Sequence, residues 1–141
     1  MSRKSSEEDK SGMSKQALTK ILLIEDDPDI QKVAKMALEA VGGFQVQICG
    51  SGPQALEEGP SFGPQLILLD VMMPKMDGAT TFRKLRENPA LSQVPVIFMT
   101  ARVQTYEIEN YKKMGALDVI RKPFDPMTLS RSIAEIWSRP G

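Results

Sequence analysis

Side chains that could do chemistry follow short apolar runs at several places in the sequence. Glu25 and Asp26 come directly after such a run, as do Asp70 and Thr100, and Lys122 lies two residues after another. Clustered carboxylates raise one another's pKa unless a cation neutralises them, and oxygen ligands without His or Cys suit Mg²⁺. An aspartate beside Mg²⁺, a hydroxyl and an ammonium group has the chemistry of a phosphoryl acceptor, because the cation and the amine stabilise charge on the transferred group.

Each of these residues also has a purely structural interpretation. An acid after a strand often caps the helix that follows, and Asp27 fits this role because Pro28 comes next. Thr100 could cap a helix in the same way, and Lys122 could be an ordinary surface lysine. The functional interpretation therefore depends on all of these side chains meeting in one place.

Composition narrows the chemistry that the chain can perform. The 141 residues include no histidine and one cysteine, Cys49. This excludes a Ser-His-Asp triad, a Cys-His dyad, a histidine-ligated metal site, a phosphohistidine on this chain, an internal disulfide and a thiolate zinc site. The 18 Lys and Arg residues balance 18 Asp and Glu residues, so no net charge draws the chain to nucleic acid or an acidic membrane.

Apolar patterning predicts the elements that would position these side chains. Strands are expected at 21–24, 44–48, 66–69, 94–99 and 117–120, and helices at 30–41, 53–58, 78–87, 104–114 and from Asp125 to Trp137. The Gly and Pro residues between 59 and 64 are expected to end the second helix. Alternating strands and helices imply a parallel sheet with helices on both faces, and ligands bind at the carboxyl edge of such a sheet.

The sequence predicts one domain with short flanking segments. Residues 1–19 are rich in Ser, Lys and Glu and are expected to form a disordered tail, residues 20–138 the domain, and residues 139–141 a C-terminal tail. No apolar run approaches the roughly 20 residues that span a bilayer, and the polar N-terminus has no signal-peptide pattern. We therefore expect a cytoplasmic domain without a membrane partner.

One motif points to a different function and is rejected. Residues 50–55, GSGPQA, fit the dinucleotide-binding pattern G-x-G-x-x-A, with an acid, Asp70, 20 residues after Gly50. The pattern follows the second strand rather than the first, and its helix is expected to span only two turns. A turn that Gly50 and Gly52 permit, with Pro53 starting the helix, accounts for the same residues.

Four motifs together resemble a bacterial response-regulator receiver domain. They are ILLIEDDPDI at 21–30, LILLDVMMPKMDG at 66–78, VIFMTA at 96–101 and GALDVIRKPF at 115–124. The resemblance covers residues 20–138, and its motifs occur in the family's order and spacing. It implies a CheY-like, doubly wound α/β fold: a flavodoxin-like (βα)5 three-layer sandwich whose parallel five-stranded sheet has the order 2-1-3-4-5.

The resemblance implies a role for each acid of the cluster. Asp70 would accept a phosphoryl group from the phosphohistidine of a sensor histidine kinase or a phosphotransfer protein. Asp70 and Asp26 would ligate Mg²⁺, and Met72 would offer its backbone carbonyl. Glu25 stands where the family commonly has aspartate, so its longer side chain would reach the metal through water.

The resemblance also implies what surrounds the acceptor. Thr100 would hydrogen-bond the phosphoryl oxygens and Lys122 would pair with them. The Lys122–Pro123 peptide would be cis, because proline lowers the cost of that isomer and the turn would aim the lysine inward. The loop after the acceptor would be shaped, and the third helix capped, by Pro74, Asp77 and Gly78.

One position departs from the family pattern. The family usually has an aromatic ring three residues before the lysine, which turns inward as the threonine moves, whereas this chain has Val119. A valine has no ring to reorient. Either the backbone and the shift of Thr100 carry the signal, or the output surface differs, or Val119 is an ordinary strand residue, which is the interpretation we prefer.

The family's output face combines the helix at 104–114, the strand at 117–120 and the last helix. Tyr106, Ile108 and Tyr111 are candidate contacts on the first of these helices. Ile108 and Tyr111 are three residues apart and share a helix face. That face is either an exposed contact surface or packed against the sheet.

Three functions remain open. The first is a receiver domain of a two-component phosphorelay, which is no metabolic enzyme and catalyses only its own phosphorylation and dephosphorylation. Its partners would be the phosphodonor and a downstream protein target or output domain. We expect no direct contact with nucleic acid, and phosphorylation-dependent homodimerisation remains an alternative. The second is a phosphatase with an aspartyl-phosphate intermediate, which commonly carries a second acid where this chain has Met72. The third is a receiver-like docking module that is never phosphorylated.

Overall fold

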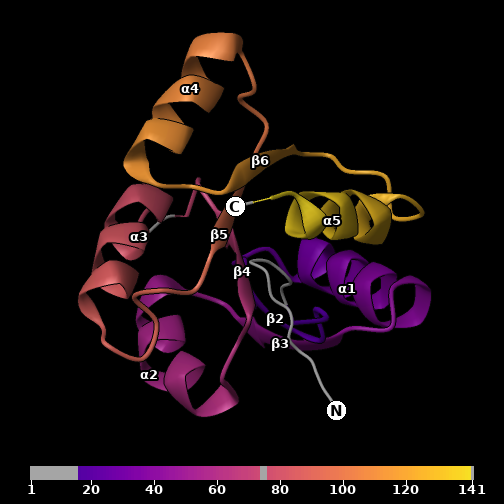
Figure 1. The fold of residues 1–141 in the computed structure, drawn as a ribbon, viewed down its shortest axis with the longest axis horizontal. Coiled ribbons are helices and arrows are strands. Elements are labelled where there is room, and N and C mark those ends of the chain that lie inside the picture. The colour runs from indigo at the N-terminus through magenta and orange to yellow at the C-terminus, as the bar shows by residue number, and fades with distance from the viewer. Residues whose placement is uncertain (1–15, 74–75, 141) are drawn as a thin grey trace, which may run out of the picture.

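A parallel five-stranded sheet forms the centre of the molecule (Figure 1). A computed structural model describes residues 16–73 and 76–140. The strands lie in the order β3-β2-β4-β5-β6, which is the predicted order 2-1-3-4-5 counted along the chain. Their bounds are β2 (Lys20–Ile24), β3 (Gln45–Cys49), β4 (Leu66–Asp70), β5 (Val96–Thr100) and β6 (Asp118–Arg121). Every pairing is parallel, so the predicted doubly wound α/β fold is confirmed.

Helices cover both faces of the sheet and make the three layers of the sandwich. In Figure 1, α1 and α5 lie on one side of the strands, while α2, α3 and α4 lie on the other. The bounds are α1 (Pro28–Met36), the π-helical turn η1 (Ala37–Val41), α2 (Gly52–Phe62), α3 (Gly78–Glu87), α4 (Thr105–Met114) and α5 (Leu129–Ser138). Among the described residues, no helix is long and apolar enough to cross a membrane.

Alternate side chains of the central strands fill two separate cores. In β2, Ile21 and Leu23 pack toward α1 and α5, while Leu22 and Ile24 pack toward α2 and α3. All five residues of β4 are buried, because this strand has a neighbour on each edge and helices on each face. Full burial of a Leu or Ile side chain contributes about 2 kcal/mol, which explains why these strands appear in the sequence as continuous apolar runs.

Two helices differ from the predicted bounds. The second helix was expected to end before Gly59, but α2 continues to Phe62, with Pro60 inside it. Pro60 falls in the last turn, where it removes a single helical hydrogen bond, and Phe62 packs against the core beyond it. The helix ends instead at Gly63, whose φ of 67° is left-handed.

The last helix starts later than predicted. Asp125 does not cap it; instead its side chain accepts from the amide of Met127 at 2.9 Å, and its carbonyl accepts from that of Thr128 at 3.1 Å. The i→i+3 bond closes a tight turn, so α5 begins only at Leu129.

Residues 16–19 lie against the end of the sheet opposite the strand carboxyl ends. The Gln65 side chain accepts from the amides of Thr19 and Lys20 at 2.7 and 2.9 Å, and the Trp137 indole donates to the Gln16 carbonyl at 2.9 Å. Leu18 packs against the core. The remainder of the predicted tail, residues 1–15, lies outside the described residues, as do Pro74 and Gly141.

Candidate functional site

The predicted cluster lies at the carboxyl edge of the sheet, where neighbouring strands bring distant residues together. Asp70 is the last residue of the central strand β4, and Glu25 follows β2 directly. Thr100 ends β5, and Lys122 follows β6. The in-register pairs Ile24–Leu69, Asp70–Met99 and Thr100–Arg121 explain this convergence, because aligned parallel strands end at the same level.

Lys122 links the two buried acids. Its Nζ lies 3.0 Å from Glu25 Oε1 and 3.1 Å from Asp70 Oδ1. The Glu25 and Asp70 side chains are 1% and 2% exposed, whereas that of Lys122 is 17% exposed. The lysine therefore reaches from the rim of the site onto carboxylates that water scarcely contacts, and the interpretation of Lys122 as an ordinary surface residue is wrong.

Burial and the neighbouring charged groups shift the pKa values of Glu25 and Lys122. Burial raises the pKa of Glu25 to about 7, the charge of Asp70 adds to this, and hydrogen bonds from Asp27 and Lys122 oppose it. For Lys122, burial lowers the pKa, but the hydrogen bond and charge of Glu25 and the charge of Asp70 outweigh it and leave the pKa raised. Among the described residues, the single ammonium group of Lys122 thus contacts two carboxylates, and the charges of these residues leave the cluster with more negative than positive charge.

The donor set of this cluster fits a hard divalent cation. One carboxylate oxygen from each of Glu25, Asp26 and Asp70 lies within 4.8 Å of the others. Glu25 and Asp70 are buried, while Asp26 is exposed and so leaves a route to solvent. Oxygen-only ligands with access to water are what Mg²⁺ requires, since it keeps several waters in its coordination shell. The three acids, with Lys122 as their cationic partner among the residues that the structure describes, supply the negative charge that would hold such an ion.

Backbone amides orient the two buried carboxylates. The amide of Met72 donates to Asp70 Oδ1 at 3.0 Å, and the amide of Asp27 donates to Glu25 Oε2 at 3.1 Å. Met72 is 59% exposed at the rim of the site. Its backbone, and not its thioether, is therefore the part of the residue that belongs to the site. Each acid therefore has one oxygen bonded to the backbone of its own loop.

Thr100 lies inside the site and does not cap a helix. Its side chain is fully buried, and Oγ1 accepts from the amide of Arg102 at 3.0 Å. The N-cap of α4 is Gln104. The Lys122 amide donates to the Thr100 carbonyl at 2.8 Å, and the Lys122–Pro123 peptide is cis, as expected.

The predicted loop residues have structural contacts of their own. Asp77 caps α3 by accepting from the amide of Thr80 at 2.8 Å, and this bond lowers the pKa of Asp77. A Cβ on Gly78 would lie 2.6 Å from the Cα of Val71, so only glycine allows the chain to return beside the acceptor strand. Asp27 caps α1 through the amide of Asp29 at 2.8 Å, which confirms the structural interpretation of that acid.

One contact beside the site was not predicted. The side-chain amide of Gln31 donates to the carbonyl of Glu25 at 2.5 Å. Gln31 lies four residues after Asp27, the N-cap of α1. Its position one helical turn into α1 was the only feature of the sequence that could have indicated this contact. The amide of Glu25 also donates to the Cys49 carbonyl at 3.0 Å, which ties the acidic loop to β3.

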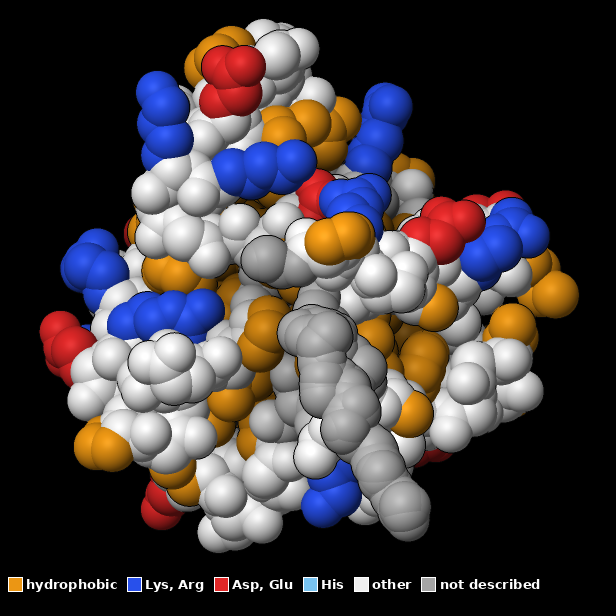
Figure 2. Space-filling model, in the orientation of Figure 1, with side chains coloured by type: hydrophobic (Ala, Val, Ile, Leu, Met, Phe, Trp, Pro, Cys, Tyr) orange, Lys and Arg blue, Asp and Glu red, His pale blue; other side chains and the backbone are white. Residues whose placement is uncertain are grey.

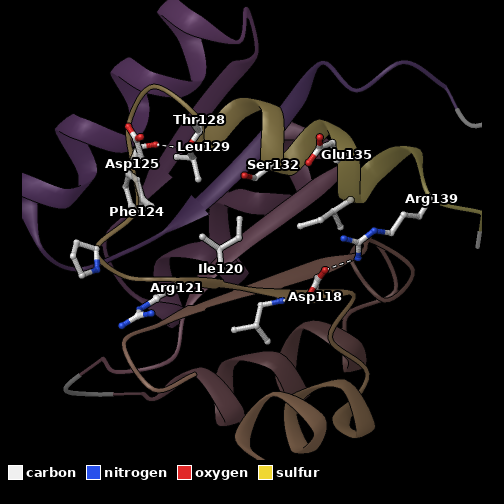
Figure 3. Close-up of a pocket in the computed structure, with 13 residues that line it drawn as sticks. Asp118, Ile120, Arg121, Phe124, Asp125, Thr128, Leu129, Ser132, Glu135 and Arg139 are labelled. Carbon is white, nitrogen blue, oxygen red and sulfur yellow. Dashed lines mark hydrogen bonds and ion pairs between the residues drawn. The ribbon is translucent and has the colours of Figure 1, made fainter. Parts of the chain in front are cut away.

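The predicted output face contains a cavity between β6 and α5 (Figure 3). The cavity has a volume of about 400 Å³ and is lined by side chains of both charges, including Arg121 and Glu135. Asp118 pairs with Arg139 at 2.6 Å across it and with Lys112 of α4 at 3.6 Å. Figure 2 shows basic and acidic side chains interspersed over the visible surface rather than a patch of one sign.

The candidate contacts on α4 differ in exposure. Tyr106 is 60% exposed, whereas Tyr111 packs against the core, with its ring 5.3 Å from that of Phe98. Ile108 is half-buried. Val119 lies opposite Phe98 in the sheet and packs against the same core, as expected of an ordinary strand residue.

The chain belongs to the response regulator receiver domain family, whose model matches residues 21–134. It is 37% identical over 113 residues to a probable C4-dicarboxylate response regulator of Halalkalibacterium halodurans, covering 79% of this chain and 48% of that protein. It is 32% identical over 120 residues to the response regulator Rre1 of Synechocystis, covering 84% and 52%. The chain thus spans about half the length of each of these relatives.

Solved structures agree with this assignment. The chemotaxis protein CheY4 of Vibrio cholerae superposes with a TM-score of 0.77 at 25% identity, covering 85% of this chain and 99% of that one. The receiver domain of the sensor histidine kinase PA1611 of Pseudomonas aeruginosa superposes with a TM-score of 0.73 at 32% identity, covering 86% and 100%. That structure has a magnesium ion coordinated in its active-site cleft. The chain is therefore a CheY-like receiver domain of the two-component signalling class, which is not a classical enzyme family.

Proposed function

We propose that this domain is a phosphorylation switch in which Asp70 accepts a phosphoryl group, with Mg²⁺ bound, from the phosphohistidine of a histidine kinase or a phosphotransfer protein. The observation that carries the proposal is the buried Asp70 carboxylate, 3.1 Å from Lys122 Nζ and within 4.8 Å of two further acids. Buried acids of like charge at one edge of the sheet repel one another and cost stability, so their clustering around Lys122 supports a functional role.

The transfer can be written with this chain's own groups. An oxygen of Asp70 forms a bond to phosphorus as the P–N bond to the donor imidazole breaks, and that nitrogen keeps the bonding electron pair. Lys122, already at the acceptor oxygen, and Thr100 then face the added negative charge, which is about two units. Asp26, Asp70 and the Met72 carbonyl would hold Mg²⁺, with Glu25 acting through water; when bound, the ion neutralises charge on the phosphoryl oxygens.

A docking place for the donor lies next to the lysine. Lys122 lines a cavity of about 430 Å³ whose other walls are mostly apolar and come from α1 and the segments after β5 and β6, including Ile30, Val33, Ala101 and Phe124. Val33 is 37% exposed although it is apolar. This surface supports a protein donor, since a small phosphodonor would need no apolar contact beside the acceptor.

We further propose that the phosphorylated domain acts through the face made by α4, β6 and α5, by binding a protein target, an output domain or a second copy. The mixed charges of that face favour a protein over nucleic acid. In the cell, a domain with these partners would work in the cytoplasm.

Intact-mass measurement after incubation with Mg²⁺ and acetyl phosphate tests the proposal. We expect the mass of one phosphoryl group on the wild-type chain and none on Asp70→Asn. Asp27→Asn is the matched control, because Asp27 is an exposed helix cap two residues from Glu25, and Asn also caps helices. No added mass on the wild type would support an unphosphorylated docking module, and turnover of a generic phosphomonoester would support a phosphatase.

A further inference from the structure

Thr100 and Phe98 lie on the same face of β5, and both are fully buried. Residues two apart in a strand project to the same side, so Phe98 is the side chain that precedes Thr100 on the α3 and α4 face of the sheet. Thr100 ends the strand beside the Asp70 site, where its carbonyl accepts from the Lys122 amide at 2.8 Å. Met99 is the one residue between Phe98 and Thr100, so a displacement of Thr100 toward Asp70 would act on Phe98 through a short length of strand backbone.

Phe98 is the middle ring of three. The Phe82 ring of α3 lies 5.4 Å from it at an interplanar angle of 82°, and the Tyr111 ring of α4 lies 5.3 Å from it at 63°. Both contacts are edge-to-face, an arrangement that depends on the relative orientation of the rings. Close-packed rings cannot absorb a shift of the central one without moving, because the core leaves little free volume.

Tyr111 is also the principal attachment of α4 to the core. The helix has no fully buried residue, and Tyr111 is the residue of α4 that packs against the core cluster on this face of the sheet. In Figure 1, α4 lies at the periphery of the molecule, beyond β6 and α3. The position of α4 should thus be sensitive to how the Tyr111 ring sits.

β6 provides no competing ring at this place. Val119 lies directly opposite Phe98 in the parallel register and packs against the same cluster as Tyr111. A valine is smaller than any aromatic residue, so the aromatic contact on this side of Phe98 comes from the helix rather than from the neighbouring strand.

We propose that Tyr111 is the positioning residue that couples the Asp70 site to α4. When Thr100 is drawn toward a phosphoryl group on Asp70, Phe98 moves against Tyr111, and α4 shifts with it. The inference rests on the proposed phosphorylation of Asp70 and adds the residue that carries the response to the outer surface.

Fluorine NMR of the 3-fluorotyrosine-labelled full chain provides the test. The chain has two tyrosines, so Tyr106→Phe assigns the two resonances, and the exposed Tyr106 is the internal control. Adding Mg²⁺ and beryllofluoride, a mimic of the phosphoryl group, should produce a bound beryllofluoride signal in the same spectrum. We expect the Tyr111 resonance to shift with that signal and the Tyr106 resonance to shift much less.

The outcomes separate the two proposals. A bound beryllofluoride signal with an unmoved Tyr111 resonance would overturn the coupling role and leave the phosphoacceptor intact. Absence of the bound signal would overturn the proposed function, and the coupling with it.

Variants test whether the ring is required. In Tyr111→Leu, we expect the beryllofluoride-induced shifts of the α4 amides to be lost while that of the Asp70 amide persists. Tyr111→Phe keeps the ring and should restore the α4 response, and Tyr106→Leu should leave it unchanged. An α4 response in Tyr111→Leu equal to that of the wild type would show that the ring carries no coupling.

Discussion

Lys122→Met should destabilise the metal-free protein, because it removes the ammonium group that two buried carboxylates share. The Nζ distances of 3.0 and 3.1 Å to Glu25 and Asp70 correspond to an attraction of about 5 kcal/mol each at an effective dielectric constant near 20. Dehydration offsets most of this, and breaking a buried pair by removing one partner typically costs about 3–5 kcal/mol. Since Glu25 can take up a proton, we expect about 3 kcal/mol at pH 8.

The pH dependence of this loss follows from the two pKa shifts. The raised pKa of Lys122 means that its ammonium group keeps its charge at every pH below its ordinary value of 10.5 and that its stabilising effect is lost on the alkaline side only above this value. Glu25, with a pKa of about 7, becomes neutral at acidic pH and then needs the lysine less. The cost of Lys122→Met should therefore be smaller at pH 5.5 than at pH 8.

Urea unfolding followed by the fluorescence of Trp137, the single tryptophan, measures this difference in the presence of a chelator. Adding Mg²⁺ should recover part of the loss, because the cation would neutralise the same acids. Lys112→Met is the matched control: its pair with Asp118 is 3.6 Å long and the lysine is 48% exposed, so we expect at most about 1 kcal/mol. Equal unfolding free energies for Lys122→Met and the wild type at pH 8 would refute the reasoning.

Three further substitutions have defined outcomes. The native pKa of Glu25 lies above its ordinary value of 4.5, so the metal-free wild type should lose stability as pH rises through 4.5 to 7; Glu25→Gln should remove about 3 kcal/mol of this dependence in urea titrations at pH 4 and pH 8. Gly78→Ala should lower the unfolding free energy by about 2 kcal/mol and slow phosphorylation of the chain by acetyl phosphate, because its Cβ would meet Val71 at 2.6 Å. Ser130→Ala should cost about 1–2 kcal/mol in the same unfolding assay, because the buried hydroxyl donates to the Ala37 carbonyl of η1 at 2.9 Å.

Matched variants control these three measurements. Glu39→Gln, at an exposed acid of η1, should leave the pH dependence unchanged, and an equal effect there would contradict the role of burial at Glu25. Gly43→Asn tests a glycine with a left-handed φ of 74° and open space around it, and should cost less than Gly78→Ala. Ser138→Ala removes an exposed hydroxyl bond to Glu135, and a loss as large as that of Ser130→Ala would argue against burial as the cause.

Local patterns were sufficient to predict the strands and the residues at their ends, whereas the order of the strands in the sheet came from the resemblance to receiver domains. Apolar runs such as 66–69 mark strands buried on both faces, and each is followed by the polar residue that its loop exposes to the sheet edge. These signals are short-range, because side-chain alternation and turn chemistry depend on neighbouring residues. The kinds of side chain present at the site could therefore be predicted without knowing the distances between them.

The predicted bounds of two helices were wrong, and tertiary packing opposed the local signal in one of them. Gly59 and Pro60 are helix breakers by type, yet α2 continues through them because Phe62 and Leu56 pack against the core. Asp125 is a good N-cap by type, yet it closes a separate turn before α5 begins. For α2, contacts with residues distant in the sequence outweighed intrinsic preferences of about 1–3 kcal/mol, whereas at Asp125 a local turn replaced the predicted helix cap.

The tertiary structure alone decided which charged groups of the site are in contact. Lys122 and Glu25 are 97 residues apart, and their 3.0 Å contact exists only because β2 and β6 end at the same edge of one sheet. The same holds for the exposure of Tyr106 and the packing of Tyr111, which helical spacing left undecided. Residue types and their order specify which groups can react, but their distances and burial, and hence their pKa values, arise when the strands pack side by side.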